Sequence, residues 1–184
     1  MPDAPKPTPP PLLMANGRPL IIAVIGGGAP PARARDLAEE VGRELARRGA
    51  TVVCGGMRGV MEAVCRGAKA EGGTTIGILP GADPAAANDF IDIPIITGMG
   101  LARNIIVVKT GRAVIAIDGA YGTLSEIAFA LGDGAPVIGL DTWALPERDG
   151  YPMPVVQAKS PADAVEKAIE AAHERDARDH TRVH

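Results

Sequence analysis

Aromatic residues, cysteines and histidines are scarce in this chain. Phe, Trp and Tyr make up 3% of the 184 residues while hydrophobic residues make up 46%, so the core must consist mainly of Val, Ile, Leu and Ala. Cys54 and Cys65 do not form a Cys-x-x-Cys pair, and we expect both to be buried thiols in a reducing cytoplasm. His173, His180 and His184 all lie near the C-terminus, which argues against a histidine-based metal or catalytic site in the core.

The chain also lacks an excess of positive charge, a long apolar run and a signal-peptide pattern. A net charge of −3 gives no general basic surface for a nucleic acid polymer, and no apolar run approaches the length of a membrane span. The N-terminus carries prolines in place of the charged and then apolar segments of a secretion signal. We therefore expect a cytoplasmic protein without a nucleic-acid or membrane partner and without a metal site. Residues 1–18 are expected to form a disordered Pro-rich tail, residues 19–173 one domain, and residues 174–184 a charged tail.

Short apolar segments alternate with segments of helical periodicity. The expected strands, apolar at most positions, cover residues 20–25, 51–54, 75–79, 90–96, 113–117, 137–140 and 155–156. The expected helices cover residues 32–48, 59–71, 101–109 and 123–131, and a last one opens at Ser160 and frays from Glu174. Pro94 places the fourth strand at a sheet edge or marks a strand end. This alternation predicts an α/β fold: a single Rossmann-like, doubly wound domain whose mainly parallel sheet carries helices on both faces.

Three of the expected strands end in glycine turns, at residues 26–28, 55–59 and 119–122. In open parallel sheets, ligands bind beyond the carboxyl ends of the strands, near the point where the strand order reverses. Glycine turns that lead into helices present bare backbone N–H groups, which suit a phosphate or another anion. Three such turns at one sheet edge therefore predict an anion-binding site.

The first of these turns does not indicate a dinucleotide site. Pro31 stands where a Gly-x-Gly-x-x-Gly pattern requires its last glycine, and the second strand ends in Cys54 rather than in an acidic residue for the ribose hydroxyls. The chain also lacks the Gly-Lys-Ser/Thr of a P-loop. Both observations argue against an NAD(P) role and against a P-loop nucleotide site.

Residues 118–126, Asp-Gly-Ala-Tyr-Gly-Thr-Leu-Ser-Glu, join a buried strand to a helix and leave two interpretations of Glu126 open. Thr123 as N-cap and Glu126 at N3 would form a capping box, in which each side chain bonds the other's backbone N–H. Alternatively, Glu126 is a functional carboxylate beside the anion site.

Two arginines stand at or near expected helix starts, where the helix dipole disfavours a cation. Arg58 lies in the turn at residues 55–59, and Arg103 follows Gly98-Met99-Gly100. A bound phosphate would reverse the sign of this effect, since a guanidinium grips phosphate through two hydrogen bonds. The alternative for each is a surface arginine, or one paired with an acid such as Glu62 or Asp118.

Several of these segments together resemble the LONELY GUY (LOG) family. Residues 119–126 are similar to that family's Pro-Gly-Gly-x-Gly-Thr-x-x-Glu signature, and residues 55–61 are similar to its Gly-Gly-Gly-x-x-Gly-Leu-Met segment. The catalytic arginine and glutamate of the family map onto Arg103 and Glu126. Asp118 replaces the signature proline and Asn104 the lysine after the arginine, forms that look closer to a sister branch containing molybdenum cofactor carrier proteins.

The resemblance implies three candidate functions. One is hydrolysis of nucleoside 5′-monophosphates to free base and ribose 5-phosphate, with Arg103 and Glu126 catalytic and no cofactor required. The second is a non-catalytic carrier that binds the molybdenum cofactor through its pterin phosphate, and the third is a nucleotide-sensing module. The family also implies a homodimer or tetramer, because a neighbouring subunit helps to complete the pocket. The expected ligand-binding residues are Gly26, Gly27, Gly28, Gly55, Gly56, Arg58, Gly59, Asp118, Gly119, Ala120, Tyr121, Gly122 and Thr123.

Overall fold

The computed structural model describes residues 6–145 and 155–182 and contains a seven-stranded sheet in which every neighbouring pair is parallel. The strand order is β4-β3-β2-β1-β5-β6-β7, so the chain reverses direction across the sheet between β1 and β5. The edge strand that holds Pro94 is β4, as the proline predicted. The strands are β1 (Ile21–Gly26), β2 (Thr51–Cys54), β3 (Thr75–Leu79), β4 (Ile93–Ile96), β5 (Ala113–Ile117), β6 (Val137–Leu140) and β7 (Val155–Gln157).

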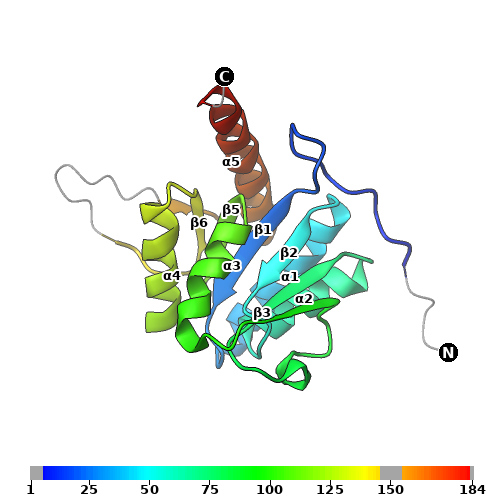
Figure 1. Cartoon of the computed structure of the whole chain (residues 1–184), viewed down its shortest axis with the longest axis vertical. Helices are drawn as coiled ribbons and strands as arrows, with labels where there is room; N and C mark the ends of the chain where they lie inside the picture. The colour runs from blue at the N-terminus through cyan, green and yellow to red at the C-terminus, as the bar shows by residue number, and fades with distance from the viewer. Residues whose placement is uncertain (1–5, 146–154, 183–184) are drawn as a thin grey trace.

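Helices cover both faces of this sheet (Figure 1). One face packs against α1 (Ala32–Arg47), α2 (Val60–Ala70) and α5 (Pro161–Arg182), and the other against α3 (Asn104–Thr110) and α4 (Tyr121–Gly132). Short 3₁₀ turns, η1 (Pro84–Ala86) and η2 (Gly100–Arg103), precede β4 and α3. The predicted Rossmann-like doubly wound α/β domain is confirmed.

The central strand β1 shows why these apolar runs form strands buried on both faces. Ile22 and Val24 pack into the core beneath α1, α2 and α5, while Ala23 and Ile25 pack into the core beneath α3 and α4. All four side chains are buried, because successive residues of a strand point to opposite faces. A strand between two helical layers has no solvated face and needs no polar alternation.

The two predicted tails are more ordered than the sequence suggested, although residues 1–5 and 183–184 lie outside the described residues. The N–H of Leu12 donates to the carbonyl oxygen of Gly49 at 2.8 Å, and the N–H of Leu20 donates to the carbonyl oxygen of Leu12 at 2.7 Å. Helix α5 continues to Arg182, and its buried Asp176 accepts the N–H of Ala15 at 2.8 Å. Prediction from composition missed these contacts because each partner lies far away in the sequence.

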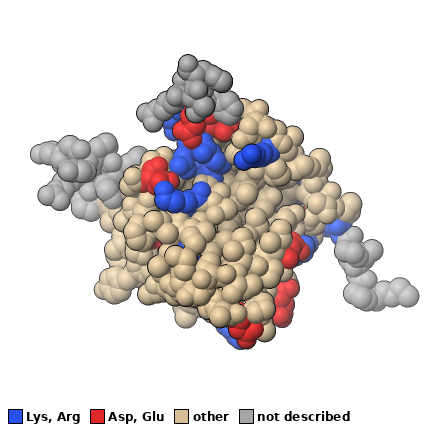
Figure 2. All heavy atoms as spheres, viewed as in Figure 1, with Lys and Arg blue, Asp and Glu red and all other residues tan. Residues whose placement is uncertain are grey.

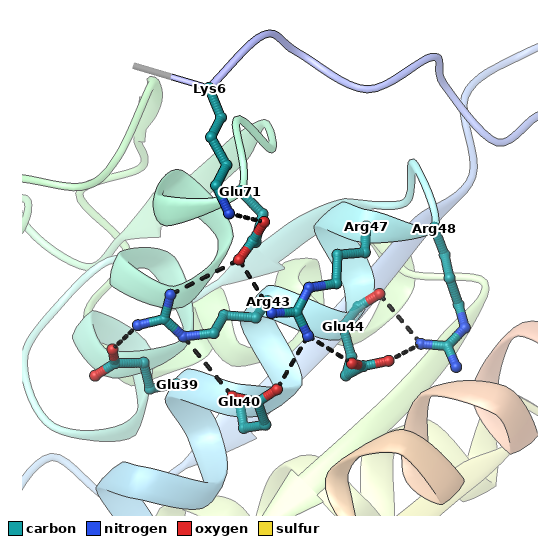
Figure 3. A network of polar contacts seen from close by, with 8 residues as sticks. All are labelled: Lys6, Glu39, Glu40, Arg43, Glu44, Arg47, Arg48 and Glu71. Atoms are coloured by element: carbon teal, nitrogen blue, oxygen red, sulfur yellow. Dashed lines mark hydrogen bonds and ion pairs between the residues drawn. The ribbon is translucent and has the colours of Figure 1, made fainter. Parts of the chain in front are cut away.

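An ion-pair network on the outer face of α1 also holds the N-terminal segment (Figure 3). The ammonium group of Lys6 lies 2.6 Å from a carboxylate oxygen of Glu71. The guanidinium group of Arg47 contacts two carboxylates, that of Glu71 at 3.1 Å and that of Glu44 at 2.8 Å. The hydrogen bond from Lys6 helps to hold the pKa of Glu71 below its usual range. The network is completed by Glu39, Glu40, Arg43 and Arg48.

None of the described helices is long and apolar enough to cross a membrane.

Candidate functional site

The glycine turns after β1, β2 and β5 meet at a hollow of about 220 Å³ at the carboxyl edge of the sheet. It lies at the reversal of strand order between β1 and β5, the position at which open α/β sheets bind ligands. The lining combines backbone of the turns with a few side chains: Val24, Ile25, Gly26, Gly27, Gly28, Gly55, Met61, Leu101, Arg103, Asn104, Ala120, Gly122, Thr123 and Glu126.

Close packing between the turns requires glycine at several of these positions. A Cβ on Gly26 would lie 2.6 Å from both the carbonyl oxygen of Ile117 and the side chain of Val60. Gly59 has a φ of +74°, and its Cβ would lie 2.4 Å from the carbonyl oxygen of Gly27. These glycines therefore hold the walls of the hollow together, in addition to exposing backbone N–H groups.

Arg103 and Glu126 form the charged centre of the hollow. Nη1 of Arg103 lies 3.7 Å from Oε1 of Glu126, and the two residues are only 7% and 6% exposed. Nη1 also donates to Oδ1 of Asn104 at 2.5 Å, while Nε has no hydrogen-bond partner within the described part of the chain. Gly55 leaves room for the guanidinium, since a Cβ there would lie 2.6 Å from Nη2. An arginine held at one nitrogen keeps donors available for a ligand.

Burial changes the acid–base properties of this pair. Removal from water raises the pKa of Glu126 to about 7, against the opposing effect of the Arg103 charge. Burial likewise lowers the pKa of Arg103, against the opposing charge of Glu126. A carboxyl group that titrates near neutrality can both accept and donate a proton at physiological pH. Such groups in a hollow mark candidate functional sites.

Of the two interpretations of Glu126, the capping box is wrong. Helix α4 begins at Tyr121, its N-cap is Ala120 in an extended conformation, and no side chain caps it. Thr123 is thus the third helical residue and Glu126 the sixth, too far along for a reciprocal cap. The helix starts two residues before the expected first residue, Thr123. With this start, the side chains of Thr123 and Glu126 line the hollow.

The structure separates some of the predicted ligand-binding residues from the hollow. Gly56, Gly59, Asp118 and Gly119 do not line it; Gly59 lines a second hollow, and Asp118 takes a φ of +48°. Gly119 leaves space for Thr123, since its Cβ would lie 2.4 Å from that side chain.

Two predicted side chains point elsewhere. Tyr121 is 82% exposed and stacks on Trp143, with ring centroids 6.2 Å apart. Arg58 is exposed and lines a different hollow. The sequence analysis gave no role to Leu101 or Asn104, which also line the hollow. The available signal was their position next to Arg103, a candidate site residue near a helix start.

The cysteines are buried free thiols, as predicted, with sulfur atoms 3.5 Å apart. The hydrogen bond with Cys54, together with burial, raises the pKa of the Cys65 thiol, so it stays protonated. Among the described residues, no group of three or more His, Cys, Asp or Glu side chains could hold a metal ion.

The chain is similar in sequence and structure to several known proteins. It is 37% identical to the molybdenum cofactor binding protein of the phototrophic bacterium Rippkaea orientalis, with a TM-score of 0.77 over 83% of this chain and 97% of that one. The molybdenum cofactor carrier protein of Chlamydomonas reinhardtii is 34% identical, with a TM-score of 0.73 over 83% of this chain and 98% of that one. A cytokinin riboside 5′-monophosphate phosphoribohydrolase of Mycobacterium tuberculosis is 35% identical over 117 residues, which span 59% of this chain and 63% of that protein.

These matches confirm the resemblance to LOG and molybdenum cofactor carrier proteins that the motifs indicated. The model of the SLOG cluster4 family matches residues 19–173, and the chain belongs to that family.

Proposed function

We propose that this protein is a phosphoribohydrolase, which cleaves nucleoside 5′-monophosphates into free base and ribose 5-phosphate. The observation that carries this proposal is the buried Arg103–Glu126 pair, with a carboxyl pKa of about 7, in a hollow walled by glycine turns. The mycobacterial relative with this activity supports it.

The N-terminus of α4 supplies the phosphate site in this proposal. The first N–H groups of a helix have no partner within the helix, and no side chain caps them here. Thr123 adds a hydroxyl, and Gly27 brings the turn after β1 beside Gly119. Backbone N–H groups at the positive end of a 12-residue helix favour a phosphate.

Glu126 then serves as the general base. Water attacks the anomeric carbon while the bond from that carbon to the base nitrogen breaks, and positive charge develops on the ribose. Ionised Glu126 stabilises that charge and takes a proton of the water, and Glu126 then passes this proton to the nitrogen of the departing base, which regenerates the carboxylate. Arg103 orients Glu126 and donates to the ribose phosphate through its free N–H groups.

Base release from a panel of nucleoside 5′-monophosphates, including AMP and isopentenyl-AMP, tests this proposal. Glu126→Gln keeps the size of the side chain and removes the base, so we expect turnover to fall by about 10²–10⁴-fold while the nucleotide still binds. Ser125→Ala, on the same helix with its hydroxyl bonded to the carbonyl of Gly122, is the matched control and should retain turnover. Equal turnover in Glu126→Gln and wild type would refute the mechanism.

The solved structures favour a second candidate, a carrier of the molybdenum cofactor. The molybdenum cofactor binding protein and the molybdenum cofactor carrier protein each match more than four fifths of this chain. In this function the cofactor is cargo rather than substrate. The same turns would bind the pterin phosphate, with Arg103 and Asn104 recognising the cargo. Absence of base release by folded wild-type protein, together with co-purification of a pterin fluorophore or molybdenum, would favour this function.

We further propose that two copies associate through the face formed by β4, η2, α3 and α4. This face carries a group of exposed apolar side chains, and Figure 2 shows a broad area there without charged residues. Leu101 is 82% exposed and also lines the hollow, so a second copy on this face would help to close the site. The apolar side chains are Ile93, Ile95, Ile96, Met99, Leu101, Ile105 and Phe129.

A further inference from the structure

A second hollow, of about 270 Å³, lies next to the first on the other side of the turn that follows β1. Gly28 lines both hollows. It is exposed, and a Cβ built on it would meet no atom within 4 Å, so the space above it is open. The two hollows therefore adjoin at an exposed residue that has no side chain.

Three arginines from separate segments line this second hollow: Arg35 on α1, Arg58 in the β2–α2 turn and Arg66 on α2. Arg66 is neutralised by Glu39, which accepts from its Nε at 2.9 Å and lies 2.7 Å from its Nη2.

The other two arginines, Arg35 and Arg58, have neither an ion pair nor a side-chain hydrogen bond with any described residue. The acidic side chain that lines the hollow is Glu62. Two uncompensated guanidinium groups thus face one acid, in a chain whose net charge is −3.

The helix starts on either side increase the positive potential. Helices α1 and α2, of 16 and 11 residues, begin after Pro31 and Gly59, and no side chain caps either of them. Their N-terminal dipoles oppose arginines at this place; Glu62 lies in the first turn of α2, whereas the first turn of α1 has no acidic residue. The arrangement suits a phosphate group, which accepts paired hydrogen bonds from guanidinium and bonds from free backbone N–H groups.

We propose that the second hollow is a phosphate subsite that takes the terminal phosphate of a diphosphate ligand. This inference rests on the proposed function in one respect: the first phosphate lies at the glycine turns of the main hollow. Gly27 abuts Gly119 there, and the next residue, Gly28, opens onto Arg35 and Arg58. A phosphoanhydride spans that single residue, whereas a monophosphate reaches only the main hollow. The ligand class is a nucleoside diphosphate or another molecule that carries a pyrophosphate group.

Calorimetric titration of the full chain with AMP, ADP and inorganic pyrophosphate tests this subsite. We expect wild type to bind ADP at least about tenfold more tightly than AMP, because only ADP engages the second hollow. Arg35→Gln and Arg58→Gln, each an exposed residue, should each reduce the ADP-to-AMP affinity ratio by about fivefold or more. Arg18→Gln removes the same charge from an exposed position at the opposite edge of the sheet and should keep the wild-type ratio.

A wild-type ratio near one, or equal ratios in Arg35→Gln, Arg58→Gln and Arg18→Gln, would overturn the inference. The titration also separates it from the proposed function. If no nucleoside 5′-monophosphate of the panel yields free base and neither AMP nor ADP binds, the phosphoribohydrolase proposal fails. Pyrophosphate alone then decides the subsite: binding that weakens in Arg35→Gln supports it, and absence of binding refutes it.

Discussion

Glu126 is a carboxyl group held where its ionisation is unfavourable. In the unfolded chain its pKa has the ordinary value of 4.5, and burial in the folded protein raises the pKa to about 7. Between these values the unfolded chain releases its proton while the folded protein keeps it. The free energy of unfolding therefore falls as the pH rises from about 4.5 to 7, and the loss is complete above the folded pKa.

The first prediction concerns this pH dependence. A difference of about 2.5 pKa units corresponds to roughly 3 kcal/mol of stability lost between acid and alkaline solution. Glu126→Gln lacks the titrating group, so urea denaturation at pH 8 should show the variant to be more stable than wild type, with a smaller difference at pH 5. Glu170→Gln, an exposed change on α5, serves as the control and should follow wild type at both pH values. Parallel behaviour of wild type and Glu126→Gln would contradict the raised pKa.

The second prediction concerns Arg103, whose charge opposes the rise in the pKa of Glu126. Arg103→Gln removes that charge, so the pKa of Glu126 should move further above 7. Under the proposed mechanism, base release at pH 7 should fall by about tenfold or more and recover in part at pH 9, as Glu126 ionises. An unshifted pH–rate profile would show that Arg103 does not act on Glu126.

At the scale of elements, α1 and α2 approach through two glycines. A Cβ on Gly42 would lie 2.0 Å from the carbonyl oxygen of Val64, and one on Gly67 would lie 1.9 Å from that of Glu39. The two helix backbones therefore touch, and the turns at the starts of α1 and α2 are brought together beside both hollows. Neither glycine has a positive φ, so contact between helices, not backbone conformation, requires them.

This contact gives the third prediction. Gly67→Ala should destabilise the protein by about 1–3 kcal/mol or more, because the added methyl group forces the helices apart. Gly132→Ala is the matched control, since a Cβ at the end of α4 would meet no atom within 4 Å. That substitution should be neutral or stabilising by about 0.5–1 kcal/mol. Thermal unfolding of both variants checks the difference, and similar melting temperatures would contradict the close approach.

At the scale of the whole molecule, the exposed apolar face predicts self-association. Ile105→Glu combined with Phe129→Glu places two charges on α3 and α4, and sedimentation velocity should then show monomers where wild type forms a larger species. Val156→Glu puts a charge on a similarly exposed apolar residue of β7, outside that face, and should leave the oligomer intact. A wild-type chain that sediments as a monomer would refute the proposed interface.

The sequence by itself determined the element order and the position of the candidate site. Short apolar runs such as residues 113–117, bounded by turn residues, indicate strands buried on both faces, and the glycine turns that follow them mark the carboxyl edge of the sheet. These features depend on neighbours in the sequence, so patterns along the chain suffice to predict them. Arg103 and Glu126 were predicted as site residues through motifs of this local kind.

Only the tertiary structure decided how the side chains are shared between the two hollows. It moved the start of α4 to Tyr121, placed Arg103 against Glu126 and assigned Arg58 to a second hollow with Arg35. It also attached the N-terminal segment, through Leu12 and Gly49, to the body of the protein. Each of these outcomes depends on groups that are distant in the sequence, and their burial and charge take effect only when folding brings them within a few ångströms.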